Sequence, residues 1–251
     1  MTKNTFNNNT DRDWEKYGKD DPYFGVVSQD KFQNSNLTSE NKKEFFQSGA
    51  DRIDNVLENI RQNIDPNFTI KKGLDFGCGV GRLVIPLAKV AEEVTGIDVS
   101  DSMLNEAKKN CEERSINNVV LTKSDDNLSS LKGKYNFIHS FIVFQHIPVN
   151  RGERIFENLL ARLESGGIGV VHFTYARQSL PMRYLLGKYV PLFNNLINLL
   201  KGRNFSYPQM QMNTYDLNRL FLIMQKANIL NCYTELTDHE ILGIVIYFKK
   251  P

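Results

Sequence analysis

A glycine-rich turn at residues 75–81 constrains the fold more than any other feature of the sequence. It reads Asp75-Phe76-Gly77-Cys78-Gly79-Val80-Gly81, between a predicted strand (residues 70–76) and a predicted helix (residues 82–91). Glycine reaches backbone conformations that other residues avoid, and it lets a ligand lie against the main chain. A strand, a glycine turn and a helix in this order indicate an α/β protein, in which the turn is either a ligand-binding site or only a tight connection.

The spacing of the glycines bears on the kind of ligand. The turn has the pattern GxGxG, and Arg82 follows Gly81. The dinucleotide-binding fingerprint GxGxxG requires a glycine where Arg82 stands. The spacing therefore weighs against a nucleotide (NAD)-binding oxidoreductase, which stays open as an alternative.

Strands and helices alternate after the turn. Further strands are predicted at residues 94–97, 119–122, 168–173 and within 135–144. A helix capped by Ser100 is expected to run to about residue 113, and another, at residues 151–163, is expected to end at Gly166-Gly167. This alternation implies right-handed crossovers and a parallel, doubly wound sheet.

Composition and charge weigh against several kinds of partner. The 31 basic residues nearly balance the 29 acidic ones, whereas phosphate binding needs clustered basic residues, so we expect no nucleic-acid partner. The three cysteines form no CxxC pair, which predicts no metal site and fits a reducing cytoplasm. The polar first ten residues are unlike a secretory leader, and no run of about 18 apolar residues occurs, so we expect no integral membrane association.

Acidic residues follow two of the predicted strands. Asp98 comes about 17 residues after the turn and could accept hydrogen bonds from both hydroxyls of a ribose, or simply cap the next helix. Asp125 and Asp126 follow the third strand and could bind an adenine amino group, or be solvated loop acids. Because the carboxyl ends of parallel strands meet at one edge of the sheet, the turn and these acids are expected to lie together.

Five motifs in sequence order carry a resemblance to a known family. They are residues 74–82, residues 96–100 with Met103, Ser124-Asp125, residues 135–148, and residues 163–167. Together they resemble the class I S-adenosylmethionine (SAM)-dependent methyltransferases of the small-molecule type. The resemblance covers residues 70–175 and, through a closing hairpin, the last twenty. It implies a Rossmann-like sheet of seven strands, mostly parallel with an antiparallel last strand, with SAM as cofactor and S-adenosyl-L-homocysteine (SAH) as product.

The resemblance also implies a set of cofactor-binding residues. The backbone of the glycine turn would meet the methionine and ribose portions of SAM, Asp98 would hold the ribose diol, and Asp125 would accept from the adenine amino group. Arg82 would pair with the methionine carboxylate. Asn136 stands where the family often has aspartate, and only local hydrogen bonding is expected to change. The full set is Asp75, Gly77, Cys78, Gly79, Gly81, Arg82, Asp98, Val99, Met103, Asp125, Asp126, Ser140 and Phe141.

Two histidines are the candidates for catalysis on the acceptor side. His146 follows the fourth strand, and His239 lies in the turn between the last two strands, so the fold places both at the carboxyl edge. Methyl transfer requires an aligned acceptor and, for a hydroxyl, removal of a proton. Either histidine could instead serve only to hydrogen-bond its neighbours.

The chain divides into five predicted segments. They are a disordered tail (1–12), an N-terminal helical cap (13–66), a SAM-binding core (67–175), a lid insert (176–213), and a C-terminal helix with the closing β-hairpin (214–251). Residues 14–28 are expected to be an ordered loop or short helix, and Thr214 is expected to cap the C-terminal helix. Gln211 or Asn213 could reach the pocket. The apolar insert could pack on the domain or dock on a membrane surface or lipid-linked substrate, so peripheral membrane contact stays open.

The sequence thus predicts a cytoplasmic, SAM-dependent methyltransferase that acts on a small-molecule acceptor. Oxygen is favoured over nitrogen as the acceptor atom, and a sugar or another metabolite is the expected kind of substrate. A SAM-binding regulator without catalysis is the second alternative. The oligomeric state is left open by the sequence.

Overall fold

Seven strands pair side by side in one sheet of order β3-β2-β1-β4-β5-β7-β6. The computed structural model describes residues 10–178, 186, 193–200, 207–208, 210–238 and 241–251. The strands are β1 (Ile70–Phe76), β2 (Ala91–Asp98), β3 (Val119–Lys123), β4 (Tyr135–Ser140), β5 (Leu163–Ala176), β6 (Cys232–Asp238) and β7 (Leu242–Lys249). The helices are α1 (Thr10–Asp20), α2 (Pro22–Val26), α3 (Ser39–Asn63), α4 (Val84–Ala88), α5 (Asp101–Glu112), α6 (Val149–Arg162), α8 (Phe193–Leu200) and α9 (Leu217–Lys226).

Strand direction confirms the predicted doubly wound sheet with an antiparallel last strand. Strand β1 pairs in parallel with β2 and β4, β2 with β3, and β4 with β5. Strand β7 runs antiparallel between β5 and β6. The carboxyl ends of β1 to β4 therefore meet at one edge, where the loops after these strands gather.

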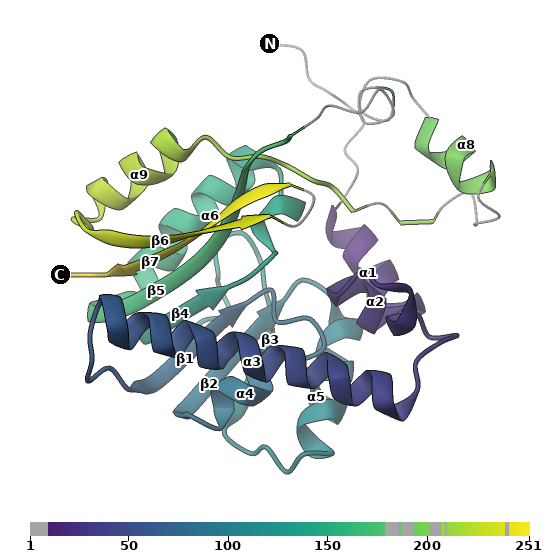
Figure 1. Ribbon diagram of the computed structural model, residues 1–251, viewed down its shortest axis with the longest axis horizontal. Helices are drawn as coiled ribbons and strands as arrows, with labels where there is room; N and C mark the ends of the chain where they lie inside the picture. Colours follow the sequence, from purple (N-terminus) through teal and green to yellow (C-terminus); the bar gives the residue numbers. More distant parts are fainter. Residues whose placement is uncertain (1–9, 179–185, 187–192, 201–206, 209, 239–240) are drawn as a thin grey trace.

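Helices cover both faces of the sheet, so the fold has three layers (Figure 1). On one face, Ile53, Val56 and Ile60 of α3 pack in the same apolar cluster as Val94 and other inward strand residues. On the other face, α6 and α9 pack against β5 and β7 in a second cluster. Because helices cover both faces, the later residues of the central strands are buried without alternation, at residues 73–76 of β1 and 94–97 of β2. No helix in the described part of the chain is long and apolar enough to cross a bilayer.

Two helix ends differ from the predicted ones. The helix expected at residues 82–91 is only the five residues of α4, because residues from Ala91 onward are recruited into β2 beside β1. Helix α6 ends at Arg162, within one residue of the predicted span 151–163, but the stop is not made by Gly166-Gly167 as expected. Its next residue, Leu163, is buried and already pairs with Tyr135 of β4, so pairing in the sheet ends the helix.

The N-terminal segment is helical from the first described residue. Thr10, Asp11 and Arg12 form the first turn of α1, so the prediction of a disordered tail up to residue 12 is wrong for these three. They are ordered because Thr10 and Asp11 bond to residues more than 130 positions away. Residues 14–28, expected as a loop or short helix, form most of α1 and all of α2.

Local side-chain capping is borne out at one helix and corrected at another. The Ser100 hydroxyl accepts from the Met103 N–H at 3.1 Å and caps α5, as predicted. Helix α9 is capped by Asp216, whose carboxylate accepts from the Asn218 N–H at 2.9 Å, and not by Thr214. The predicted local role of Asn136 is also seen, since its Oδ1 accepts from the N–H groups of Lys71 and Lys72.

A strap at residues 211–215 joins the insert to the carboxyl edge of the sheet. The Asn213 N–H donates to the Gln145 carbonyl at 2.6 Å, and the Tyr215 N–H donates to the Thr174 carbonyl at 2.7 Å. The buried Tyr215 hydroxyl lies 3.0 Å and 2.9 Å from the carbonyl oxygens of Phe144 and Ile147. The strap thereby fixes the 3-10 turn η2 (Phe144–His146), which follows β4.

We predict that Tyr215→Phe lowers the free energy of unfolding by about 1–2 kcal/mol, because two buried carbonyl groups lose their hydroxyl partner while the ring volume is kept. Urea denaturation measures the change. The matched control is Tyr233→Phe, which removes a half-buried hydroxyl from edge strand β6 and should cost less than about 0.5 kcal/mol. An equal loss in both variants would contradict the assigned anchoring role.

Candidate functional site

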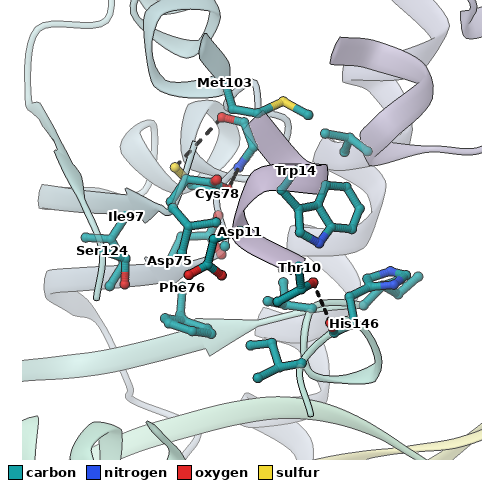
Figure 2. Close-up of a pocket in the computed structure, with 18 of the residues that line it drawn as sticks. Thr10, Asp11, Trp14, Asp75, Phe76, Cys78, Ile97, Met103, Ser124 and His146 are labelled. Carbon is teal, nitrogen blue, oxygen red and sulfur yellow. Dashed lines mark hydrogen bonds between the residues drawn. The ribbon is translucent and has the colours of Figure 1, made fainter. Parts of the chain in front are cut away.

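A cavity opens at the carboxyl edge of the sheet, above the ends of β1 to β4. Figure 2 shows residues of β1, β2 and α1 around it, with Trp14 and His146 on the same side. Most of the lining is apolar, and the polar groups are few. Those lining residues with ionisable side chains are Asp11, Asp75, Cys78, Arg82, Asp98, Asp125, Asp126, His146 and Arg151.

The glycine turn brings the main chain to the wall of the cavity. Gly77 and Gly79 have φ angles of +74° and +51°, which side chains disfavour. A Cβ at Gly77 would lie 2.5 Å from the Val143 side chain, and one at Gly79 would lie 2.6 Å from Val26. Glycine is therefore required twice over here, for backbone conformation and for space.

Asp98 links the glycine turn to the start of α5. Its Oδ2 accepts from the Gly79 N–H and its Oδ1 from the Ser100 N–H, both at 2.9 Å. Burial raises the pKa of this carboxyl to about 6, even though the two N–H groups act to lower it. Asp98 lines the cavity, and each of its oxygens can accept a further hydrogen bond from a ligand.

Arg82 is a buried cation on the wall of the cavity. Only 9% of the surface of Arg82 is exposed, and this burial lowers the pKa of its guanidinium to about 10. Its Nη1 donates to the Ser48 hydroxyl at 3.3 Å, while its Nε has no hydrogen-bond partner among the residues that the structure describes. A buried guanidinium with an unused donor is suited to an anionic ligand group.

The acidic pair after β3 splits into two roles. Asp125 accepts from the N–H groups of Ser129 and Asn127, and these bonds lower the pKa of its carboxyl. Asp126 accepts from Nε of Arg151 at 2.5 Å. Both residues line the cavity, but the Asp126 carboxylate is already committed to Arg151.

His146 is buried and neutral at the cavity wall. Its Nδ1 donates to the Gln211 carbonyl at 2.7 Å, so its Nε2, 3.2 Å from the Gln145 amide nitrogen, is the acceptor. Burial lowers the pKa of His146 to about 4, although the bond to Gln211 opposes the shift. The ring packs edge-on against Trp14 at 4.9 Å.

Most of the predicted cofactor residues come together, and a few do not. Val99, Met103, Cys78 and Phe141 line the cavity with the residues already described. Two predicted members, Gly81 and Ser140, are missing from the described lining. Gly81 packs near Ala107 of α5, and the Ser140 hydroxyl turns inward to the Phe76 carbonyl at 3.1 Å.

The predictions for the rim have mixed outcomes. His239 lies outside the described residues. Gln211 and Asn213 do not appear among the described lining residues. Their main-chain groups instead join the strap to η2, because the Gln211 carbonyl bonds His146 and the Asn213 N–H bonds Gln145.

The sequence predicted an N-terminal helical cap at residues 13–66, but not which of its residues line the cavity, nor the part played by the start of α6. Thr10, Asp11 and Trp14 line the cavity from α1, and Arg151 lines it from α6. The spacing of Trp14 and Tyr17 and the acids in the first turn are helix signals that could have been read. Nothing local indicates which side chains of this helix face the sheet edge.

A further missed residue is Ile142, which lines the cavity just after β4. Its φ angle is +59°, a conformation that is strained for a β-branched side chain. Such strain is found where a site over-determines the backbone. No sequence pattern marks this position.

The central part of the chain matches known methyltransferase sequences. Residues 74–167 match the family model described as a methyltransferase domain. A magnesium-protoporphyrin O-methyltransferase from Synechocystis is 34% identical over 85 residues, 34% of this chain and 37% of that protein. A ubiquinone biosynthesis O-methyltransferase from Coxiella burnetii is 31% identical over 97 residues, 39% of this chain and 41% of that protein. The match thus spans well under half the length of these relatives.

Solved structures share the fold across most of the chain. Magnesium protoporphyrin IX methyltransferase from Synechocystis, crystallised with SAH, has a TM-score of 0.58 at 19% identity and covers 90% of this chain and 99% of its own. An N-methyltransferase from Bradyrhizobium japonicum with SAH has a TM-score of 0.56 at 13% identity, over 97% and 99%. Residues 74–167 thus match a methyltransferase domain, and the sheet order of the chain is that of a fold shared with these methyltransferase structures.

Proposed function

We propose that the protein transfers a methyl group from SAM to a small-molecule acceptor, with oxygen favoured over nitrogen as the acceptor atom. The observation that carries the proposal is the joint placement of Asp98, the glycine turn and Arg82 around one cavity at the carboxyl edge of the sheet. Bound SAM would supply a methyl group already activated by a positively charged sulfur.

The adenosine end of the cofactor fits the β2 and β3 side of the cavity. Asp98 would accept hydrogen bonds from the ribose hydroxyls, while its existing bonds to Gly79 and Ser100 hold it in place. Val99 would pack on the adenine, and Asp125 would accept from the adenine amino group. The Asp126 side chain is held by Arg151, which leaves its backbone for the cofactor, as the resemblance implied.

The methionine end fits the wall formed by the glycine turn and Arg82. The unused Nε donor and the low solvent access of Arg82 support pairing with a carboxylate. A carboxylate at this point would relieve the cost of a buried guanidinium whose Nε has no hydrogen-bond partner in the described part of the chain. The same reasoning supports SAM or SAH over a ligand that lacks an anionic end.

The acceptor class rests on the relatives and on the shape of the site. Two of the relatives described above are named as O-methyltransferases, of magnesium-protoporphyrin and in ubiquinone biosynthesis. Helix α1 lies over the cavity, with Trp14 and Thr10 in its wall, and leaves a confined space suited to a small acceptor. We also infer that His146 positions the acceptor or takes its proton, which requires Gln145 to release Nε2. His239 is retained as a candidate on the sequence argument alone.

Incubation with isotope-labelled SAM and a metabolite extract is expected to give labelled methyl products by mass spectrometry. Asp98→Ala should give little product because the ribose loses its acceptor. The control Asp65→Ala removes a carboxylate that pairs with Lys249 far from the cavity and should retain full activity. If the parent binds SAM tightly yet yields no product from any extract, the alternative of a non-catalytic SAM-binding regulator is preferred.

Binding of SAH is expected to weaken as the pH falls below 6. The raised pKa of about 6 means that Asp98 is ionised at pH 7.5 but protonated at pH 5. Affinity at pH 5 should be about tenfold lower if the carboxylate form is the one that binds. Calorimetric titration at both pH values tests this, with Asp98→Asn as the variant that should bind weakly at both. A parent whose affinity does not change with pH would exclude Asp98 as the ribose ligand.

His146→Ala is expected to keep its affinity for SAM and to lower turnover. Because burial holds the pKa of His146 near 4, the imidazole stays neutral from pH 5 upward, and kcat should show no inflection near 6.5 from this residue. Loss of a general base or acceptor-positioning group typically costs about 100-fold or more in kcat. Turnover equal to that of the parent, measured with the product identified above, would dismiss both roles.

A further inference from the structure

We propose that Arg151 is a positioning residue that latches helix α1 over the cavity, so that cofactor exchange requires the Asp11–Arg151 ion pair to open. The inference rests on the proposed function for the identity of the cofactor. The latch itself rests on contacts between described residues and can be tested without a cofactor.

Arg151 joins α1 to the opposite wall of the cavity. Its Nη1 and Nη2 donate to the two carboxylate oxygens of Asp11 at 2.7 Å and 2.8 Å, a two-pronged contact between residues 140 positions apart. Its Nε donates to Asp126 at 2.5 Å. Burial alone would lower the pKa of Arg151, but the two carboxylates outweigh it and raise the pKa. All three side chains line the cavity.

This contact holds the first turn of α1 over the cavity. Asp126 belongs to the loop after β3, whereas Asp11 belongs to the first turn of α1, so one guanidinium bridges the wall and the cover. The bidentate geometry fixes the direction as well as the distance of the pair. Release of Asp11 would free the first turn of α1 and leave Asp126 bonded to Arg151.

The remaining contacts of α1 divide into a hinge side and an opening side. Glu15 accepts from the hydroxyls of Ser100 and Ser102, both at 2.8 Å, and these bonds outweigh burial and lower its pKa to about 2. This end of the helix is further held by Gly18, where a Cβ would lie 2.5 Å from the Ser100 hydroxyl. At the other end, the Thr10 hydroxyl donates to the His146 carbonyl at 3.0 Å.

The exposure of the latch fits reversible opening. The Asp11 side chain is 43% exposed and that of Arg151 is 21% exposed, so water can replace the contact when it breaks. A fully buried pair would be too costly to separate on each turnover. The Glu15 side chain is less exposed than that of Asp11, at 29%, and makes three hydrogen bonds, which favours motion about the Glu15 end.

Trp14 provides a direct readout of the cover. It is the only tryptophan in the sequence, it lies on α1, and it lines the cavity beside His146 (Figure 2). In the cofactor-free protein, Asp11→Asn is expected to raise the quenching of Trp14 fluorescence by acrylamide. The matched control is Asp20→Asn, which breaks an exposed pair with Lys16 on the same helix. Quenching equal to that of the parent in Asp11→Asn would overturn the latch.

Stopped-flow release of SAH, followed by Trp14 fluorescence, tests the consequence for exchange. Asp11→Asn and Arg151→Met should release SAH about three- to tenfold faster than the parent, the range expected for a partly exposed charged hydrogen bond. Arg151→Lys, which keeps the charge without the two-pronged contact, should give an intermediate rate. Asp20→Asn should match the parent.

The outcomes separate the latch from the proposed function. Unchanged release in Asp11→Asn, or an equal acceleration in Asp20→Asn, would refute control of exchange by Arg151. Thermal melting of each variant detects a general loss of folding. If the role of Arg151 were merely structural, its variants would melt at lower temperature, while SAH release from the folded fraction would be unchanged. A parent that binds no SAH would refute the proposed function, and the quenching comparison would then decide the latch alone.

Discussion

The arrangement of the site depends on the hydrogen bonds that the Asp98 carboxylate accepts from the main chain. Asp98 ends β2 and accepts from the main chain of both the glycine turn and the start of α5. These two segments follow different strands, and their separation sets the width of the cavity. Burial disfavours the charged form of Asp98 and therefore lowers the stability of the fold at neutral pH. The two N–H groups offset part of this free-energy cost.

A second buried charge lies across the same cavity. Arg82 is held by α3 through Ser48 and by the close packing of Gly49, where a Cβ would lie 2.3 Å from the Arg82 carbonyl oxygen. Its unused Nε donor leaves the site electrostatically incomplete in the absence of a ligand. In the proposed function, stability and ligand binding therefore make opposite demands on Asp98 and Arg82, as is common at functional sites.

The sheet alone supplies only the floor of the cavity, and distant segments supply its sides. The strap at residues 211–215 holds η2 and sets the tautomer of His146 through the Gln211 carbonyl. Helix α1 adds Trp14, which packs against His146, and the Asp11–Arg151 contact. The strap and α1 bond to loops at the ends of strands, so the chemistry around the cavity can vary while the packed core is unchanged.

The sequence by itself determined which strand each of the candidate site residues follows. Strand β1 begins and ends where predicted, Ser100 caps α5, and the glycine turn, Asp98 and Asp125 meet at one edge. These features follow from local patterns and from the rule that parallel strands share a carboxyl edge. The same rule placed His146 at the rim.

Only the tertiary structure decided which groups are free to act. The Asp126 side chain is taken by Arg151, the Ser140 hydroxyl turns inward, and His146 is buried as a neutral ring. Tertiary contacts also end α6 at Arg162 and keep Thr10 and Asp11 ordered in the first turn of α1. Each outcome depends on a contact between residues distant in sequence, whose energy no local pattern contains. For this reason the sequence placed the candidate residues at one sheet edge, and the fold decided their charges and partners.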